Sequence, residues 1–166
     1  MSLHKLTTLA LYTTLSMAVY AIESAIPPLV PLPGIKLGLA NVVTLILLQR
    51  YTAKDAFLVL IARLLLSTLL FGQLLSLLYS LAGGILSFSV MYPINRLLRK
   101  KLPFLTGAVG GLFHNLGQLL TAFAITATAG VLAYLPYLAI SGILAGLFTG
   151  LCAHFAERYL LSRLYS

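Results

Sequence analysis

Three charged residues stand within or beside long apolar stretches of this 166-residue sequence, namely Glu23, Lys36 and Arg63. A charge at the centre of a membrane-spanning helix costs at least about 2.5–3.5 kcal/mol on insertion scales, so Arg63 requires a partner. Glu23 is the one acidic residue well inside an apolar stretch, because Asp55 and Glu157 fall near stretch ends. Two interpretations remain open: an ion pair of Glu23 with Arg63 or Lys36 that only holds helices together, and a cluster that faces a ligand.

The densest polar group in the sequence is His114-Asn115-Leu116-Gly117-Gln118. In a helix His114, Gln118 and Thr121 share one stripe, while Asn115 points about 100° away from His114. Imidazole and amide groups can orient a ligand in a polar cavity, and Asn41 of another apolar stretch could line the opposite wall. Hydrogen bonding between membrane helices is an equally good explanation of these residues.

The sequence lacks the residues that ATP binding, metal binding and diphosphate chemistry require. The sequence has no GxxxxGK[ST] loop for ATP, so any ATP-driven work must come from another subunit. Its three histidines, His4, His114 and His154, are too dispersed for a metal site, and Cys152 is the single cysteine. Only one aspartate is present, whereas Mg²⁺-dependent diphosphate chemistry uses clustered aspartates. We therefore expect no metal, no cofactor and no catalysis on prenyl diphosphates by this polypeptide alone.

Long apolar stretches dominate the remainder of the chain. The mean hydropathy is +1.02 and 60% of residues are hydrophobic, which leaves little polar surface for a water-soluble domain. The pattern predicts an all-α integral membrane protein, a single domain formed by a bundle of six transmembrane helices. The predicted spans are 6–26, 35–49, 55–71, 74–95, 105–126 and 134–157. The second is short for a full crossing and can start deeper in the membrane.

Basic residues alternate between the gaps that separate these spans. Nine of the eleven lie at the N-terminus, in the second and fourth gaps and at the C-terminus: Lys5, Arg50, Lys54, Arg96, Arg99, Lys100, Lys101, Arg158 and Arg163. Because basic loops stay on the cytoplasmic side, both termini are predicted to lie inside the cell. These charges are spread over four edges without aromatic stacking surfaces, so lipid headgroups are expected as counter-charges and no nucleic acid is expected.

Small residues mark faces where helices can approach closely. Ala18, Ala21 and Ala25 fall on one face of the first span, which could receive another helix of this chain or of a partner. Spacing of four residues recurs in the last two spans, at Gly107 and Gly111 and at Gly142, Gly146 and Gly150. The proline-rich segment 27–34 is predicted to be an external loop that folds back over the bundle.

Two motifs resemble a known family. The segment GIKLGLANVVT at residues 34–44, after the proline-rich loop, and GGLFHNLGQ at residues 110–118 resemble the bacterial membrane family called heptaprenyl diphosphate synthase component I, or Gx transporter family. The resemblance covers nearly the whole chain. That family is similar to the substrate-binding S components of energy-coupling factor (ECF) transporters, which implies six helices, cytoplasmic termini, and a first external loop that caps a ligand site. The absence of tryptophan prevents the inference of a particular vitamin.

The resemblance implies a small-molecule-binding subunit in the bacterial cytoplasmic membrane, partnered by an ECF coupling subunit and cytoplasmic ATPases. The coupling subunit would meet the alanine face of the first span. Lys36 and Arg63 would suit a carboxylate or phosphate unless Glu23 neutralises one of them. The residues expected to line or support the site are Glu23, Lys36, Asn41, Arg63, His114, Asn115 and Gln118.

The alternative is an accessory subunit of heptaprenyl diphosphate synthesis that anchors a soluble polyprenyl synthase through the basic loop 96–101. Those charges are equally explained by membrane topology alone. A stand-alone channel or carrier is a third hypothesis. The link to isoprenoid or quinone metabolism rests only on the resemblance.

Overall fold

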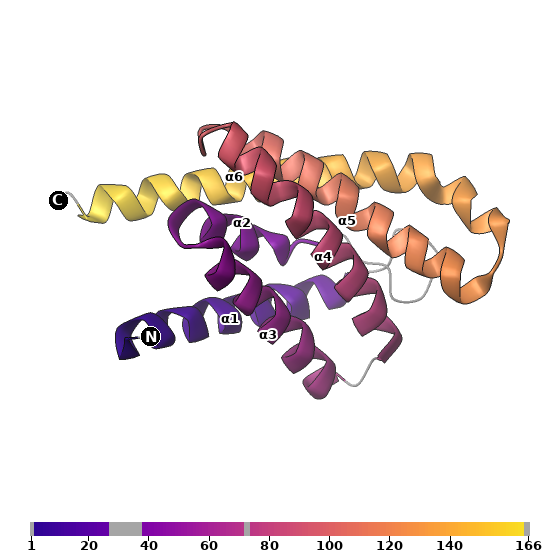
Figure 1. Ribbon diagram of the computed structural model, residues 1–166, viewed down its shortest axis with the longest axis horizontal. Coiled ribbons are helices and arrows are strands. Elements are labelled where there is room, and N and C mark those ends of the chain that lie inside the picture. The colour runs from indigo at the N-terminus through magenta and orange to yellow at the C-terminus, as the bar shows by residue number, and fades with distance from the viewer. Residues whose placement is uncertain (1, 27–37, 72–73, 165–166) are drawn as a thin grey trace.

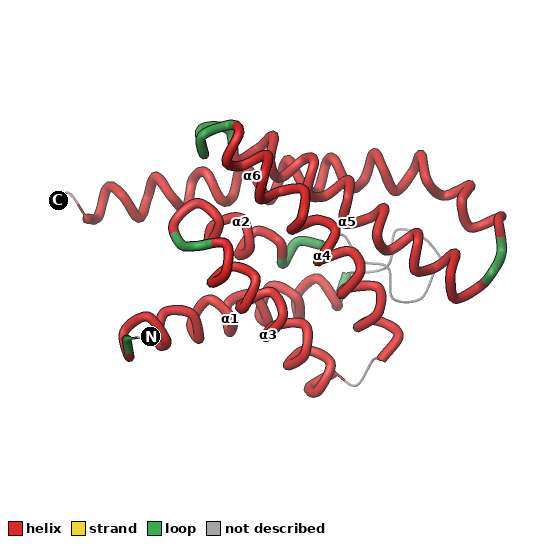
Figure 2. Tube along the Cα trace, viewed as in Figure 1, coloured by secondary structure: helices red, strands yellow, loops and turns green. Residues whose placement is uncertain are grey.

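A computed structural model describes residues 2–26, 38–71 and 74–164 of the chain. These residues form helices joined by short connections, with no strand among them, so the all-α prediction is confirmed for this part of the chain (Figure 2). The elements are α1 (Leu3–Ser24), α2 (Asn41–Arg50), α3 (Ala53–Phe71), α4 (Leu74–Leu97), α5 (Pro103–Thr126), the 3-10 helix η1 (Ala129–Tyr134) and α6 (Leu135–Leu164).

Three helical segments are long and apolar enough to cross a membrane: Leu74–Leu97, Pro103–Thr126 and Ala129–Tyr159. Large apolar side chains face outward along the molecule, as for Leu69 (80% exposed) and Phe155 (65%), while Arg63 and His114 are buried. This distribution is the inverse of that in a water-soluble protein and suggests membrane association. A bundle of six membrane-crossing helices stays a prediction.

Helix α2 is shorter than the predicted span 35–49. It begins at Asn41, and residues 35–37 lie outside the described part of the chain. Ten residues extend about 15 Å, half of the roughly 30 Å thickness of the hydrocarbon core. Eight of its ten residues are buried, so the apolar side chains of α2 pack against the neighbouring helices. The beginning of α2 therefore lies inside the bundle.

The apolar core surrounds α2. Leu47 belongs to a buried cluster that also contains Leu9 of α1, Val59 of α3, Met91 of α4 and Ala153 of α6. Figure 1 shows α2 between α1 and α6. This packing fixes the position of the residues that precede and begin α2.

Helices α5 and α6 approach each other through glycine. A Cβ added to Gly111 would lie 2.1 Å from the carbonyl oxygen of Gly142, and one added to Gly107 would lie 2.3 Å from that of Gly146. No side chain fits at such separations. The glycine repeats seen in the sequence therefore mark a backbone-to-backbone contact within the chain.

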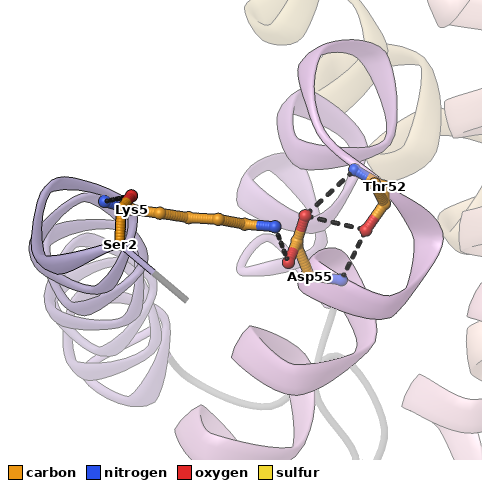
Figure 3. A network of polar contacts seen from close by, with 4 residues as sticks. All are labelled: Ser2, Lys5, Thr52 and Asp55. Carbon is orange, nitrogen blue, oxygen red and sulfur yellow. Dashed lines mark hydrogen bonds and ion pairs between the residues drawn. The ribbon is translucent and has the colours of Figure 1, made fainter.

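Polar contacts join the helix ends that the sequence predicts to be cytoplasmic. Lys5 of α1 forms an ion pair with Asp55 of α3 at 2.8 Å, and Asp55 also accepts hydrogen bonds from the backbone N–H and hydroxyl of Thr52 (Figure 3). Lys100 donates to the carbonyl oxygen of Gln49 at 2.6 Å, at the C-terminal end of α2. The first turn of α1 and the end of α6 lie at the same end of the molecule, opposite the α5–α6 connection (Figure 1).

Candidate functional site

The turn before α2 is held by a carboxylate from another helix. Glu23 is 4% exposed near the end of α1, and its Oε1 accepts a hydrogen bond from the backbone N–H of Gly38 at 2.5 Å. Its Oε2 accepts a longer one from Ala40 at 3.4 Å. A negative charge is favourable there because the beginning of a helix carries partial positive charge. Glu23 thus binds α1 to the interior start of α2.

Gly38 permits this turn to approach α5. Its φ is +80°, a conformation that residues with a side chain rarely adopt, and a Cβ would lie 2.6 Å from Cδ2 of His114 and 3.1 Å from Nδ2 of Asn41. The imidazole of His114 therefore packs directly on the backbone of Gly38, with the Asn41 amide beside it. Gly83 of α4 contacts the other edge of the ring, since a Cβ there would lie 2.9 Å from Nδ1 of His114.

The hydrogen bond of His114 defines its tautomer. Nε2 of His114 lies 3.1 Å from Nε2 of Gln118, one helical turn along α5. An amide nitrogen can only donate, so Nε2 of His114 is the acceptor and a neutral ring carries its proton on Nδ1. Nδ1 faces the backbone of Gly83 in α4, with which the ring interacts. The ring is consequently held between α2 and α4 by packing and by Gln118.

Arg63 contributes a buried cation from α3. Its side chain is 3% exposed and lies within electrostatic range of Glu23, Tyr20 and His114. Within the described part of the chain, its Nε and Nη2 atoms have no hydrogen-bond partner, nor does Nδ2 of Asn41. Buried donors are nearly always paired in folded proteins. The guanidinium and amide thus have spare hydrogen-bonding capacity in the interior.

Five of the seven residues expected at a ligand site gather around the turn that begins α2. We call this set the buried polar cluster: Glu23, Asn41, Arg63, His114 and Gln118. Its members come from α1, α2, α3 and α5. The charged residues Glu23 and Arg63 and the polar stripe of α5 thus lie in one place. Binding of a ligand by these residues stays a prediction.

Of the other two expected site residues, Asn115 lies apart from the cluster. Asn115 turns toward α6, where its amide nitrogen donates to the Leu138 carbonyl oxygen at 2.8 Å and contacts the Ser141 hydroxyl at 3.2 Å. It joins α5 to α6, on a face of α5 about 100° from that of His114. Lys36 lies outside the described residues, and so does the segment 27–34 predicted to be a loop.

The predicted partner face of α1 is largely uncovered. Ala18 and Ala25 are exposed and Ala21 is half-buried. Ile22 (66% exposed) extends the same apolar surface. This arrangement leaves room for another helix, and the contact with a coupling subunit stays a prediction.

Sequence reasoning overlooked Gly38 and Gly83 as parts of the cluster. Gly38 lies inside the GIKLGLANVVT motif, and Gly83 is one of two consecutive glycines in α4. The available signal was a glycine within the predicted span 35–49, three residues before Asn41. The role of Gly38, which is to let the imidazole of His114 approach the backbone, depends on a contact between segments far apart in the sequence.

The described residues form an all-helical fold with three apolar segments long enough to cross a membrane and a polar cluster buried inside it. The family model of heptaprenyl diphosphate synthase component I matches residues 12–156, and the chain belongs to this family. The matched region contains the whole buried polar cluster. Neither a curated protein nor a solved structure matches the chain.

Proposed function

We propose that this chain is a substrate-binding membrane subunit of the S-component type, which captures a small molecule for an energy-coupling factor transporter. On this proposal six segments lie in the membrane, both termini face the cytoplasm, and a coupling subunit with ATPases supplies the energy. The observation that carries it is the buried polar cluster at the interior beginning of α2. Transport proteins commonly place substrate groups at the ends of interrupted helices near the bilayer midplane.

The arrangement also has a chemical rationale. Ionisable residues inside a membrane are costly and mark functional positions more often than other residues do. A single Glu–Arg contact would be enough to join α1 to α3. The cluster also contains the imidazole of His114 and the amides of Asn41 and Gln118, and some of its buried donors have no partner among the described residues. This surplus favours ligand binding over a purely structural role.

Native mass spectrometry of the full chain tests this function. The protein released from detergent is expected to retain a small molecule, and His114→Leu should reduce its occupancy at least about tenfold, because the imidazole lies directly on the Gly38 turn. His154→Leu, at the far end of α6, is the matched control and should keep full occupancy. A wild-type chain that carries no small molecule and does not co-purify with coupling-factor subunits would contradict the proposal.

A second candidate function follows from the family match. As a component I protein, the chain could serve as a non-catalytic membrane subunit that anchors a soluble polyprenyl diphosphate synthase. The basic loop offers a surface for this contact, since Arg96, Arg99 and Lys101 are exposed. Lys100 is less suited to it because its ammonium group already caps the end of α2 at Gln49.

Charge neutralisation in this loop separates the two functions. If the chain anchors a synthase, the double variant Arg99→Gln/Lys101→Gln should lose at least about tenfold in synthase recovered by pull-down, through loss of two exposed charges. Lys54→Gln, an exposed residue outside the loop, is the control for charge alone. Unchanged recovery of a synthase by the double variant would exclude this loop as the anchor. Failure of the wild-type chain to recover any synthase would count against the second function itself.

A further inference from the structure

The hydrogen-bonding inventory of the buried polar cluster is unbalanced. Its carboxylate is engaged, because Glu23 accepts from the backbone N–H groups of Gly38 and Ala40. The acceptor nitrogen of His114 is engaged by the Gln118 amide. The atoms without partners among the described residues are Nε and Nη2 of Arg63 and Nδ2 of Asn41. All three are donors.

The donors of Arg63 and Asn41 are both connected to the turn that begins α2. The Asn41 amide adjoins the turn at Gly38, on which the His114 ring is packed. Arg63 lies within electrostatic range of His114 and of Glu23, which holds the same turn. Both side chains therefore border the interior end of α2, where the partial positive charge of the helix adds to that of the guanidinium. The Nδ1 atom of His114 points the other way, toward Gly83, and takes no part.

We propose that the ligand of this cluster carries an oxyanion, a carboxylate or a phosphate group, which accepts hydrogen bonds from the guanidinium of Arg63 and the amide of Asn41. This inference rests on the proposed function and names the chemistry of the substrate. Guanidinium groups bind carboxylates and phosphates through paired, charge-assisted hydrogen bonds, which a neutral hydroxyl or carbonyl group cannot reproduce. Glu23 already occupies the backbone donors of Gly38 and Ala40, so the oxyanion is bound by the side-chain donors.

Within this arrangement Glu23 and His114 are positioning residues. Glu23 keeps the Gly38 turn in place, and His114 packs against that turn beside the Asn41 amide. The oxyanion of the ligand then completes the hydrogen bonds that the protein leaves unmade. These hydrogen bonds should be strong, because a buried donor without a partner destabilises the protein more than a donor exposed to water.

The test measures thermal unfolding of the full chain in detergent with sodium phosphate, sodium acetate or sodium chloride at equal ionic strength. Phosphate or acetate at about twice its Kd should raise the Tm of the wild-type chain by about 2 °C over chloride. Arg63→Gln should abolish this rise. Asn41→Leu should reduce it by at least half, and it serves as the second variant where Arg63→Gln does not fold. Arg96→Gln, an exposed arginine at the end of α4, should keep the full rise. A larger shift with phosphate or with acetate identifies the preferred oxyanion.

Two results would overturn the inference. The first is that phosphate and acetate stabilise the wild-type chain no more than chloride does. The second is that they stabilise Arg63→Gln and Asn41→Leu as much as the wild type. The small molecule retained in native mass spectrometry provides an independent readout, since it should contain a carboxylate or phosphate. A retained neutral molecule, with no effect of the anions, would leave the proposed binding function standing and refute only the oxyanion.

Discussion

Gly111→Ala is expected to lower the free energy of unfolding by about 3 kcal/mol, the largest stability loss anticipated for one added methyl group in this chain. The new Cβ would lie 2.1 Å from the Gly142 carbonyl oxygen and 2.9 Å from the Cα of Gly146. Both neighbours are backbone atoms of α6, so no side-chain rotation can relieve the overlap and the two helices must move apart. Thermal or denaturant unfolding of the purified chain in detergent measures the change.

Gly130→Ala provides the matched control for this variant. Gly130 lies in η1, and a Cβ there meets only the Thr128 methyl group at 3.7 Å, an ordinary van der Waals contact. The same chemical change should therefore alter stability by less than about 0.5 kcal/mol. Equal stability of Gly111→Ala and Gly130→Ala would show that α5 and α6 are not in backbone contact.

Glu23→Gln is expected to destabilise the chain by about 3 kcal/mol through electrostatics. The substitution removes the negative charge that opposes the buried Arg63 and weakens the hydrogen bonds to Gly38 and Ala40. An amide of the same size leaves the packing unchanged, so the loss reports charge and hydrogen bonding. Glu157→Gln, a half-buried carboxylate near the end of α6, is the matched control and should change stability by less than about 0.5 kcal/mol.

The double variant Glu23→Gln/Arg63→Met distinguishes charge compensation from other causes. Removal of the cation relieves the cost of an uncompensated buried charge, so the double variant should be more stable than Glu23→Gln alone. Ligand retention should nevertheless be lost, because Arg63 is part of the proposed binding group. If the two substitutions are additive in unfolding experiments, Glu23 and Arg63 do not interact and the cluster must be reconsidered.

Helix boundaries were largely predictable from the sequence. The predicted spans 55–71, 74–95 and 105–126 agree with α3, α4 and α5 to within two residues at each end, because charged residues and Pro103 interrupt long apolar runs. Larger differences occur at α2, whose predicted start at 35 is six residues earlier than Asn41, and at α6, which ends at Leu164, seven residues beyond the predicted 157. Hydropathy reports only that a segment avoids water. It does not distinguish a helix that faces lipid from a shorter one enclosed by its neighbours.

The candidate site was predictable in part. Glu23, Arg63 and the stripe of His114 and Gln118 are conspicuous because polar groups are expensive in an apolar segment. Their common position around the Gly38 turn required the structure, since the cluster unites residues from four helices. Glu23 accepts hydrogen bonds from the backbone N–H groups of Gly38 and Ala40. Every residue except proline has such a group, so residue types could not have predicted this pairing.

Composition, spacing and sequence motifs alone were sufficient to predict helices for the described residues, membership of the heptaprenyl diphosphate synthase component I family, and a few polar residues in apolar surroundings. These features depend on local composition and spacing, which are properties of neighbouring residues. The tertiary structure alone decided that Asn115 joins α5 to α6, while Asn41 and Arg63 keep unpartnered donors at the interior start of α2. The physical reason is that a polar group's role depends on which groups share its enclosed space, and packing of distant helices sets that neighbourhood.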